Sequence, residues 1–356
     1  MAILTFKSSY LFRRKCVYLE TFYDATLGLL QRSSIALGFF DGVHPGHQFV
    51  IGAAVEEARR QKLVASVVTF KDHPRSLTQG SSPLLLTVID QRLAQFEKLG
   101  VEAALVLNFT EELCRLTPAE YVKNILVEAM GAKFISVGYN HHFGRDREGN
   151  PKLLAELGKN LGFSVQVAPP IFVDGQEVSS SRIREAIVAG EMEVANRLLS
   201  RPYAIVGQVV SGDARGRSIG IPTANLATEE YQVIPARGVY VGTARLAKGE
   251  AMPAVINVGL RPTFASDKLK QEAASSGRDS SNLLVEAHIL DFNENIYNQK
   301  LEVCFLKYLR KEQKFDSVAA LKEQILSDCR QAGQYLQVEK SRSNATKGKP
   351  EHKLHA

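Results

Sequence analysis

The stretch SIALGFFDGVHPGHQFVIGAAVEEARRQK, residues 34–62, decides the fold of the first half of the chain. Its opening, residues 34–40, is a short apolar run that ends at an Asp-Gly pair, which is typical of a buried strand leading into a turn. Pro45 stands where the first turn of a helix tolerates proline, and apolar residues then recur at helical spacing. The stretch therefore predicts a strand, a loop and a helix in succession.

The same alternation continues along the chain. Strand-like runs occupy residues 64–70, 103–109, 133–139 and 162–170, and helical patterns occupy 90–100, 117–131 and 181–199. Strands that alternate with helices indicate βαβ units and a parallel sheet covered on both faces. We expect an α/β domain over residues 34–200, after an N-terminal extension at 1–33.

From Tyr203 the pattern changes to short β-branched runs separated by glycine turns, at 203–210, 238–246, 253–260, 283–290 and 301–309. Such runs with few helices between them indicate an antiparallel barrel. Residues 317–337 read as an amphipathic helix that closes this second domain, at 201–337. We interpret the Ser-rich residues 265–282 as an exposed insertion, and 338–356 as a disordered basic tail.

Composition narrows the classes of function. The net charge is +6, but the last 17 residues carry five Lys/Arg and one Glu, which argues against a nucleic-acid partner for the folded part. No run approaches the roughly 20 apolar residues of a membrane span. Four dispersed cysteines favour a reducing, cytoplasmic setting without disulfides or zinc. An organellar transit peptide in the first 19 residues and a homo-oligomer both stay open.

Two imidazoles, His44 and His47, fall in the loop between the first strand and its helix. Ligand sites of such sheets lie at the carboxyl ends of the strands, where helix N-termini present free N–H groups to anions. Two histidines there could stabilise charge that builds on a phosphate during group transfer. Packing or chance explains an isolated His-x-Gly-His pattern equally well.

A second polar motif, SSSRIRE at residues 179–185, opens a predicted helix. Its hydroxyls could cap the first turn while Arg184 reaches the same anion as the histidines. Taken alone, a helix cap followed by a solvated arginine is the simpler interpretation. The occurrence of both motifs in one predicted sheet favours the phosphate site.

The second half carries a different polar pattern. Glycines recur in residues 207–226, where they permit close approach of the backbone to phosphate or simply form tight hairpin turns. Thr223 and Asn225 lie two apart on an extended segment and therefore face the same way, which suits Mg²⁺ that also binds phosphate oxygens. Glu286 lies in an apolar strand and is either a general base or an outward-facing surface group.

His44-Pro45-Gly46-His47 is similar to the HxGH signature of the nucleotidyltransferase superfamily, and residues 179–184 resemble its ISSTxIR signature. The surrounding stretches, 36–48 and 137–150, resemble the FMN adenylyltransferase module of bacterial bifunctional riboflavin kinase/FAD synthetases. The resemblance implies AMP transfer from ATP to the phosphate of FMN, with His44 and His47 stabilising the α-phosphate. It implies outer-phosphate or other nucleotide contacts at Ser180, Ser181, Arg184, Gly38, Phe40, Asp41, Gly46 and Asn140.

This first module departs from the family pattern at three places. Phe39 replaces a frequent Asn, Ser181 replaces the usual Thr, and His141-His142 stand where Phe and a small or basic residue are usual. Ser181 keeps the hydroxyl, whereas the His pair could alter the affinity for flavin or ATP. A riboflavin kinase with a degenerate adenylyltransferase domain is therefore an alternative.

The stretches GRSIGIPTANL (216–226), NVGLRPTF (257–264) and 285–317 resemble the riboflavin kinase domain of the same family. The resemblance implies a six-stranded Greek-key barrel with a C-terminal helix. It implies Mg²⁺ and ATP binding at Thr223 and Asn225, deprotonation of the ribityl 5′-hydroxyl by Glu286, and a flavin contact at Arg310. Further nucleotide contacts are expected at Gly212, Gly216 and Gly220.

The combined prediction is a bifunctional enzyme with a Rossmann-like nucleotidyltransferase domain followed by a β-barrel kinase domain. Riboflavin and ATP would give FMN and ADP, and FMN and a second ATP would give FAD and pyrophosphate, with Mg²⁺ at both steps. A flavin-binding regulatory protein without turnover is the rival from another class. A pure binder has no use for a phosphate-activating histidine pair or a general base, which argues against that rival.

Overall fold

The computed structural model describes residues 18–72, 83–212, 216, 219–229, 231–247, 249–260 and 283–347. These residues divide into two compact units. The first comprises residues 18–40, 47–72 and 92–169, and the second comprises 41–46, 83–91 and the described residues from 170 onward. Each unit has a hydrophobic core of its own.

In the described part of the first unit, six strands form a sheet in the order β1-β4-β3-β2-β5-β6, and all neighbours are parallel. This confirms the predicted parallel sheet. The two strands β2 and β4 are buried along their whole length, which explains their continuous apolar runs. The strands are β1 (Glu20–Phe22), β2 (Ser33–Leu37), β3 (Val64–Phe70), β4 (Ala103–Leu107), β5 (Ala132–Gly138) and β6 (Ser164–Ala168).

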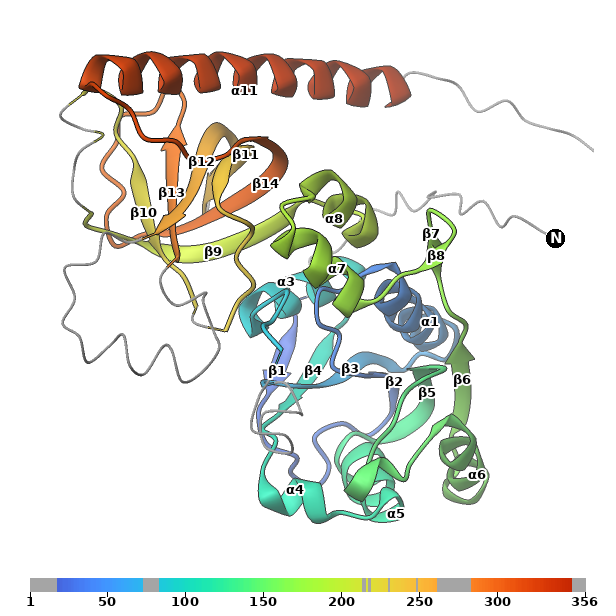
Figure 1. The fold of residues 1–356 in the computed structure, drawn as a ribbon. Helices are drawn as coiled ribbons and strands as arrows, with labels where there is room; N and C mark the ends of the chain where they lie inside the picture. Colours follow the sequence, from blue (N-terminus) through green and yellow to red (C-terminus); the bar gives the residue numbers. More distant parts are fainter. Residues whose placement is uncertain are drawn as a thin grey trace, which may run out of the picture. The chain divides into compact units, whose positions relative to one another are not determined.

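Helices cover both faces of this sheet. Figure 1 shows α1 (Pro45–Gln61) and α3 (Ile89–Leu99) on one face, and α5 (Pro118–Tyr121) and α6 (Pro151–Leu161) on the other. The short helix α4 (Glu111–Arg115) precedes α5, which continues as a π-helical segment, Val122–Ala129. A capping box at Thr117 and Glu120 begins α5, and Asn150 caps α6.

The strand order places a topological switch point between β2 and β5. From β2 the chain moves to β3 and β4 on one side, and it returns to β5 on the other side. The carboxyl ends of β2, β3 and β5 therefore lie together, and this edge is where open α/β sheets bind their ligands.

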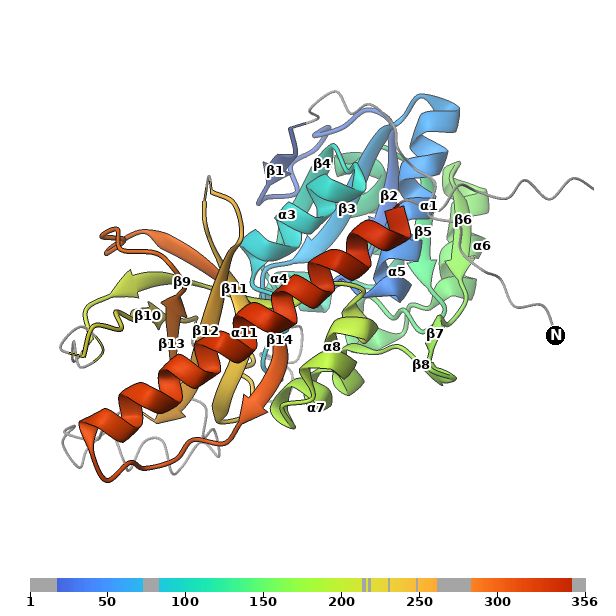
Figure 2. The same ribbon diagram turned by 90° about the horizontal axis from the view of Figure 1, so that it is seen from above.

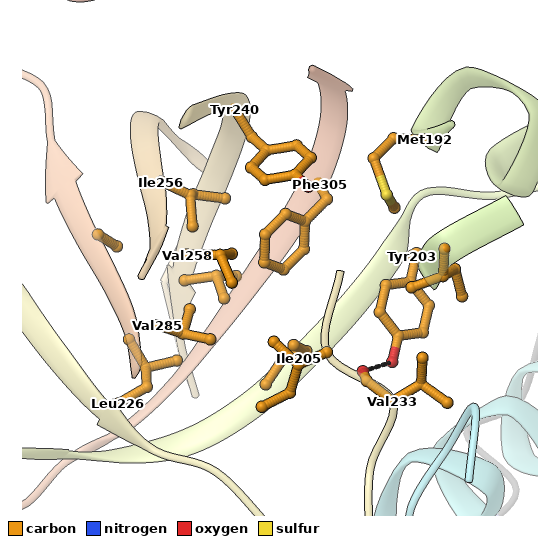
Figure 3. Packing of buried hydrophobic residues seen from close by; sticks show 14 of the residues in the cluster. Met192, Tyr203, Ile205, Leu226, Val233, Tyr240, Ile256, Val258, Val285 and Phe305 are labelled. Atoms are coloured by element: carbon orange, nitrogen blue, oxygen red, sulfur yellow. Dashed lines mark hydrogen bonds between the residues drawn. The ribbon is translucent and has the colours of Figure 1, made fainter. Parts of the chain in front are cut away.

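In the described part of the second unit, six antiparallel strands close into a barrel in the order β10-β13-β12-β11-β14-β9, which confirms the predicted barrel. Aliphatic side chains fill most of its interior, and among them Tyr240 packs edge-on against Phe305 at 5.3 Å while the Tyr203 hydroxyl donates to the carbonyl of Val233 (Figure 3). The strands are β9 (Tyr203–Val210), β10 (Ala224–Ala227), β11 (Gly238–Leu246), β12 (Met252–Leu260), β13 (Leu283–Ile289) and β14 (Lys300–Arg310).

Two helices and a hairpin precede the barrel in this unit. The hairpin pairs β7 (Phe172–Val173) with β8 (Gln176–Glu177), and α7 (Ser180–Val188) and α8 (Met192–Leu199) follow. Helix α8 contacts β9 and β14 and adds Met192 to the barrel core (Figure 3). The predicted single helical stretch over 181–199 is thus two helices, because the chain turns at Gly190, where φ is 79°.

The long helix α11 (Val318–Lys347) lies along the outside of the barrel and contacts β11 and β12 (Figures 1 and 2). It packs Ala332 against Val239, Val241 and Val255. The helix continues ten residues into the stretch predicted to be a disordered tail, since Lys, Glu, Arg and Ala suit a helix as well as a coil.

Two further expectations concern the N-terminal extension and the Ser-rich insertion. Residues 20–22, inside the predicted N-terminal extension, form β1 and pair with β4. Three residues are too few to show a strand periodicity. The predicted insertion at 265–282 lies outside the described residues. No helix in the described part of the chain is both long and apolar enough to cross a bilayer.

Candidate active sites

Hydrogen bonds to the buried carboxylate of Asp41 fix the loop before α1. Asp41 is 2% exposed, and its carboxylate accepts hydrogen bonds from the amides of Leu86 at 3.1 Å and Thr87 at 3.0 Å. Arg184 of α7 donates from Nη2 to the same carboxylate at 2.7 Å. The Asp41–Arg184 pair therefore connects the aspartate and the arginine that were predicted to contact nucleotide.

The three consecutive serines at the start of α7 have different environments. Ser179 caps α7 by accepting from the amide of Arg182, as the simpler interpretation of this motif expects. Ser180 donates from Oγ to the carbonyl oxygen of Asp41 at 3.0 Å. Ser181, on the next position, is exposed. The helix start therefore lies against the Asp41 loop and leaves one hydroxyl facing solvent.

His44 is 6% exposed and lies beside two arginines. Burial, followed by the positive charges of Arg201 and Arg184, lowers the pKa of His44 to about 4. The imidazole is therefore neutral at pH 7 and offers one N–H donor. Arg201 donates to the carbonyl oxygens of Gly42 at 2.6 Å and Val43 at 3.3 Å, and burial lowers its pKa to about 10, so that it stays charged.

The backbone of the same loop is strained. Val43 has φ 41°, which is costly for a β-branched residue, and Gly42 has φ 81°. A Cβ at Gly42 would lie 2.7 Å from the Leu86 side chain, and one at Gly46 would lie 3.1 Å from the His44 ring. Gly42 therefore needs to be glycine on account of both its φ and the Leu86 side chain, whereas a side chain at Gly46 would press on the His44 ring.

In the first unit, His47 lies in α1 and packs edge-on against Phe40, with ring centroids 5.4 Å apart. Phe40 has φ 58° and packs in turn on Phe96 of α3 at 5.9 Å. A Cβ at Gly38 would lie 2.9 Å from the Phe40 ring, so this predicted nucleotide contact also makes room for that ring.

Arg92 of α3 is fully buried and joins two strand ends. Its guanidinium donates to the carbonyl oxygens of Phe39 at 2.9 Å, Phe70 at 2.8 Å and Lys71 at 2.7 Å. It also lies 4.5 Å from the centroid of the Phe39 ring. The unusual Phe39 thus takes part in a cation–π contact that helps to fix the ends of β2 and β3.

Behind Asn140, which is exposed just after β5, lies a small aromatic cavity of about 40 Å³. The Tyr121 hydroxyl and His141 Nε2 are buried, and neither has a hydrogen-bond partner among the described residues. Burial lowers the pKa of His141 to about 4, so its ring is neutral at pH 7. The cavity is lined by Phe70, Phe109, Leu113, Tyr121, His141, His142, Phe143 and Gly144.

Most of the kinase residues predicted from the sequence line one cavity of about 680 Å³ beside the barrel. Asn225 of β10 pairs in register with Glu286 of β13, and Glu286 pairs with Asn257 of β12 on its other side. Thr223 lies two residues before Asn225 and lines the same cavity. The three residue types expected to act together are therefore adjacent across the strands.

The glycine loop lies against this polar row. A Cβ at Gly212 would lie 2.2 Å from Asn225 Nδ2, and one at Gly216 would lie 2.3 Å from the carbonyl oxygen of Ile221. Gly220 has φ 79° and lines a second cavity of about 340 Å³. Thr223 lines both cavities, so the segment around it forms the wall between them.

Arg310 also lines the larger cavity, but its guanidinium is held by Asp328 of α11. Nε and Nη2 donate to the carboxylate at 3.0 and 2.7 Å, and Nη1 donates to the carbonyl of Lys311. Asp328 is 1% exposed and also accepts from Gln324. The geometry therefore connects Arg310 with the C-terminal helix, and the expected flavin contact stays a prediction.

Four residues of these sites were missed by the sequence reasoning. Arg92 carried a signal, since it lies four residues before the buried Phe96 on the apolar face of α3. His288 alternates with the buried residues of β13, as Glu286 does, whereas Asn257 interrupts a run of buried residues in β12. Arg201 carried none, because an arginine before a proline looks like an ordinary linker.

Comparison with known proteins identifies the family of each half of the chain. Residues 28–182 match the family model described as FAD synthetase, and residues 199–336 match that described as riboflavin kinase. A bifunctional riboflavin kinase/FMN adenylyltransferase of Pseudomonas fluorescens is 37% identical over 293 residues, which cover 82% of this chain and 89% of that protein. The protein of that name in Haemophilus influenzae is 36% identical over 301 residues, 84% of this chain and 93% of its own.

A solved structure also resembles the chain. The crystal structure titled macrolide-efflux protein from Streptococcus pneumoniae has a TM-score of 0.73 and 32% identity, and the match covers 87% of this chain and 97% of that one. From its curated relatives, the chain belongs to the family of bifunctional riboflavin kinase/FMN adenylyltransferases. The family resemblance inferred from the motifs is thereby confirmed.

Proposed function

We propose that the chain carries out the two reactions of its family at two separate sites, riboflavin phosphorylation at the barrel and FMN adenylylation at the parallel-sheet motifs. The observation that carries the first assignment is the register of Asn225 opposite Glu286, with Thr223 on the same cavity. This register places the neutral oxygen atoms of Thr223 and Asn225 and the carboxylate of Glu286 along one cavity, which is large enough for a drug-sized ligand.

At the barrel, we assign riboflavin to the larger cavity and ATP to the smaller one, because Thr223 lines both. Glu286 accepts the proton of the ribityl 5′-hydroxyl as that oxygen attacks the γ-phosphorus of ATP. The bond from the γ-phosphorus to the β-bridging oxygen breaks, and ADP leaves. Gly220 lines the smaller cavity, whereas Gly212 and Gly216 let their loop pack closely on Asn225 and on the Ile221 carbonyl beside the larger one.

Thr223 and Asn225 offer a hydroxyl and an amide oxygen, which are hard donors of the kind that Mg²⁺ prefers. Within the described residues, no group of three or more His, Cys, Asp or Glu side chains could hold a metal. The donor set thus fits an ion that takes most of its ligands from phosphate and water. When bound, Mg²⁺ would neutralise charge on the transferred phosphoryl group.

At the second site, an FMN phosphate oxygen attacks the α-phosphorus of ATP, and the bond to the bridging oxygen of the departing pyrophosphate breaks. We assign stabilisation of the α-phosphate to His44 and His47, and binding of the outer phosphates to Arg184, Ser180 and Ser181. Two guanidinium groups, Arg184 and Arg201, adjoin His44, and since Arg184 is paired with Asp41, the net positive charge of the group is one.

The aromatic cavity beside His141 suits one edge of the flavin ring. Phe143 stacks on His141 at 6.0 Å and packs on Tyr121 at 5.8 Å, so the walls are planar and apolar. The unpartnered Tyr121 hydroxyl and His141 Nε2 could bind polar atoms on that edge. A cavity of about 40 Å³ holds only a few water-sized groups, so it admits an edge of the ring and not the whole flavin.

Product chromatography tests the proposal. The purified chain is incubated with riboflavin, excess ATP and Mg²⁺, and riboflavin, FMN and FAD are separated over time. FMN that rises and then converts to FAD supports both assignments. FMN that accumulates without FAD supports the alternative in which the adenylyltransferase half is degenerate, and no product at all supports the non-catalytic flavin binder. The dispersed cysteines favour the cytoplasm as the site of action.

A further inference from the structure

His288 lies two residues after Glu286 on β13 and lines the same 680 Å³ cavity. Its Nδ1 is 2.7 Å from the carbonyl oxygen of Pro222. A carbonyl oxygen only accepts hydrogen bonds, so Nδ1 carries the proton and donates it to Pro222. The nucleotide-binding segment is therefore tied to β13 from the riboflavin side.

This hydrogen bond crosses the wall between the two cavities. His288 lines the larger cavity, Pro222 lines the smaller one, and Thr223 lines both. The register of β10 with β13 begins at Ala224, opposite Ala287. Thr223 thus lies just before the strand ladder, between the tight turn at Gly220 and the first paired residue.

The bond restrains the one backbone dihedral of Pro222 that proline leaves free. The pyrrolidine ring fixes φ, and a hydrogen bond to the carbonyl restrains ψ by holding the plane of the peptide that joins Pro222 to Thr223. With both dihedrals of Pro222 set, the peptide plane that leads into Thr223 is fixed, which limits the positions that the Thr223 side chain can take. A displacement of about 1 Å in such a group is enough to slow a transfer step about a hundredfold.

We propose that His288 is a positioning residue of the kinase site, which holds Thr223 in place through the Pro222 carbonyl. It acts through the backbone and does not itself bind the transferred group. The inference rests on the proposed kinase function for its consequences, but the hydrogen bond and its effect on the segment can be measured without turnover.

Three substitutions of His288 distinguish the effect of its hydrogen-bond donor from the effect of its size. In His288→Asn, the side-chain amide nitrogen occupies nearly the place of Nδ1 and keeps the donor. In His288→Gln, the nitrogen falls where Nε2 lies, and in His288→Ala, the donor is absent. Hydrogen exchange of the full-length protein, followed by mass spectrometry of peptides spanning residues 221–227, reports the order of the segment directly.

We expect amides of that segment to exchange about tenfold faster in His288→Ala and His288→Gln, since one hydrogen bond is worth roughly a factor of ten, and within about threefold of wild type in His288→Asn. The same two variants should require more Mg²⁺ for half-maximal FMN formation, whereas conversion of FMN to FAD should be unchanged. Equal exchange in the wild type and His288→Ala, or equal impairment in the Asn and Gln variants, would overturn the assignment.

The two readouts also separate this inference from the kinase proposal. If the wild type forms no FMN, but hydrogen exchange is faster only in the variants that lack the donor, the kinase assignment is wrong and the hydrogen bond to Pro222 still positions the segment. If the wild type forms FMN normally and every variant behaves like it, His288 has no positioning role.

Discussion

Removing Arg310 should destabilise the second unit, because it leaves a buried carboxylate behind. Asp328 is 1% exposed and receives two hydrogen bonds from Arg310, at 3.0 and 2.7 Å. Breaking a buried ion pair from one side costs about 3–5 kcal/mol. The cost should lie near the lower end, about 3 kcal/mol, because Arg310 is 21% exposed and Gln324 still donates to the carboxylate.

A double-mutant cycle tests this value. Arg310→Met keeps the apolar stem and removes the charge, and Asp328→Asn keeps the shape and removes the partner. We expect the single changes to cost about 3 and 1–2 kcal/mol, and the double change to cost at least about 1 kcal/mol less than their sum. The free energies come from urea unfolding followed by far-ultraviolet circular dichroism, since the chain contains no tryptophan.

Two outcomes would refute the reasoning. If Arg310→Met costs less than about 1 kcal/mol, the pair is not the buried contact described, and its value is that of an exposed one. If the two changes are additive, Arg310 does not act on the helix through Asp328. A loss of riboflavin affinity in Arg310→Met alone, with Asp328→Asn unchanged, would instead support the flavin contact predicted from the sequence.

Four further changes test the two sites. Glu286→Gln should slow FMN formation by about 10²–10⁴-fold, the usual share of a general base, while conversion of added FMN to FAD continues. His47→Ala should do the reverse in the same chromatographic assay, and loss of both activities in a folded variant would contradict the division of labour. Tyr121→Phe should raise the KM for FMN about tenfold, while its thermal midpoint stays equal or rises, because it deletes a buried hydroxyl without a partner among the described residues. The pKa of His44 is about 4 in the folded protein and 6.5 in the unfolded chain, so the unfolded chain binds the proton first as the pH falls. The free energy of unfolding should therefore decrease between pH 6.5 and 4, by up to about 3 kcal/mol. Urea unfolding curves across this pH range should show a smaller decrease for His44→Gln.

The strand and helix pattern was enough to predict both folds, because each buried strand had to be apolar along its length and each helix along one face. β2 is buried at every position, and β13 alternates between buried Val285, Ala287 and Ile289 and the polar residues between them. What the pattern could not predict was β1, which owes its place to pairing with β4, and the extension of α11. β1 depends on a tertiary contact, and the extension of α11 is a polar helix whose sequence shows no apolar periodicity.

The candidate sites divide in the same way. The residues that we expect to act through their side chains, such as His44, Arg184 and Glu286, could be named because they lie in stretches that resemble family motifs. The hydrogen-bond partners of Arg201, Arg92 and His288 could not be named, because all three residues donate to backbone carbonyls. Every residue offers a carbonyl, so a burial pattern such as that of Arg92 marks the residue but not its partner.

The two sites also differ in how they balance phosphate charge, and the difference follows from their residues. Near His44 the chain itself supplies positive charge, because Arg184, which is paired with Asp41, and Arg201 both adjoin the imidazole. In the proposed kinase site, Thr223 and Asn225 are neutral and Glu286 is an acid, so an added cation would balance the charge of ATP. Under that proposal the wall around Thr223 would have to be placed before the ion binds, and the hydrogen bond from His288 to the Pro222 carbonyl is the contact that we propose for this task.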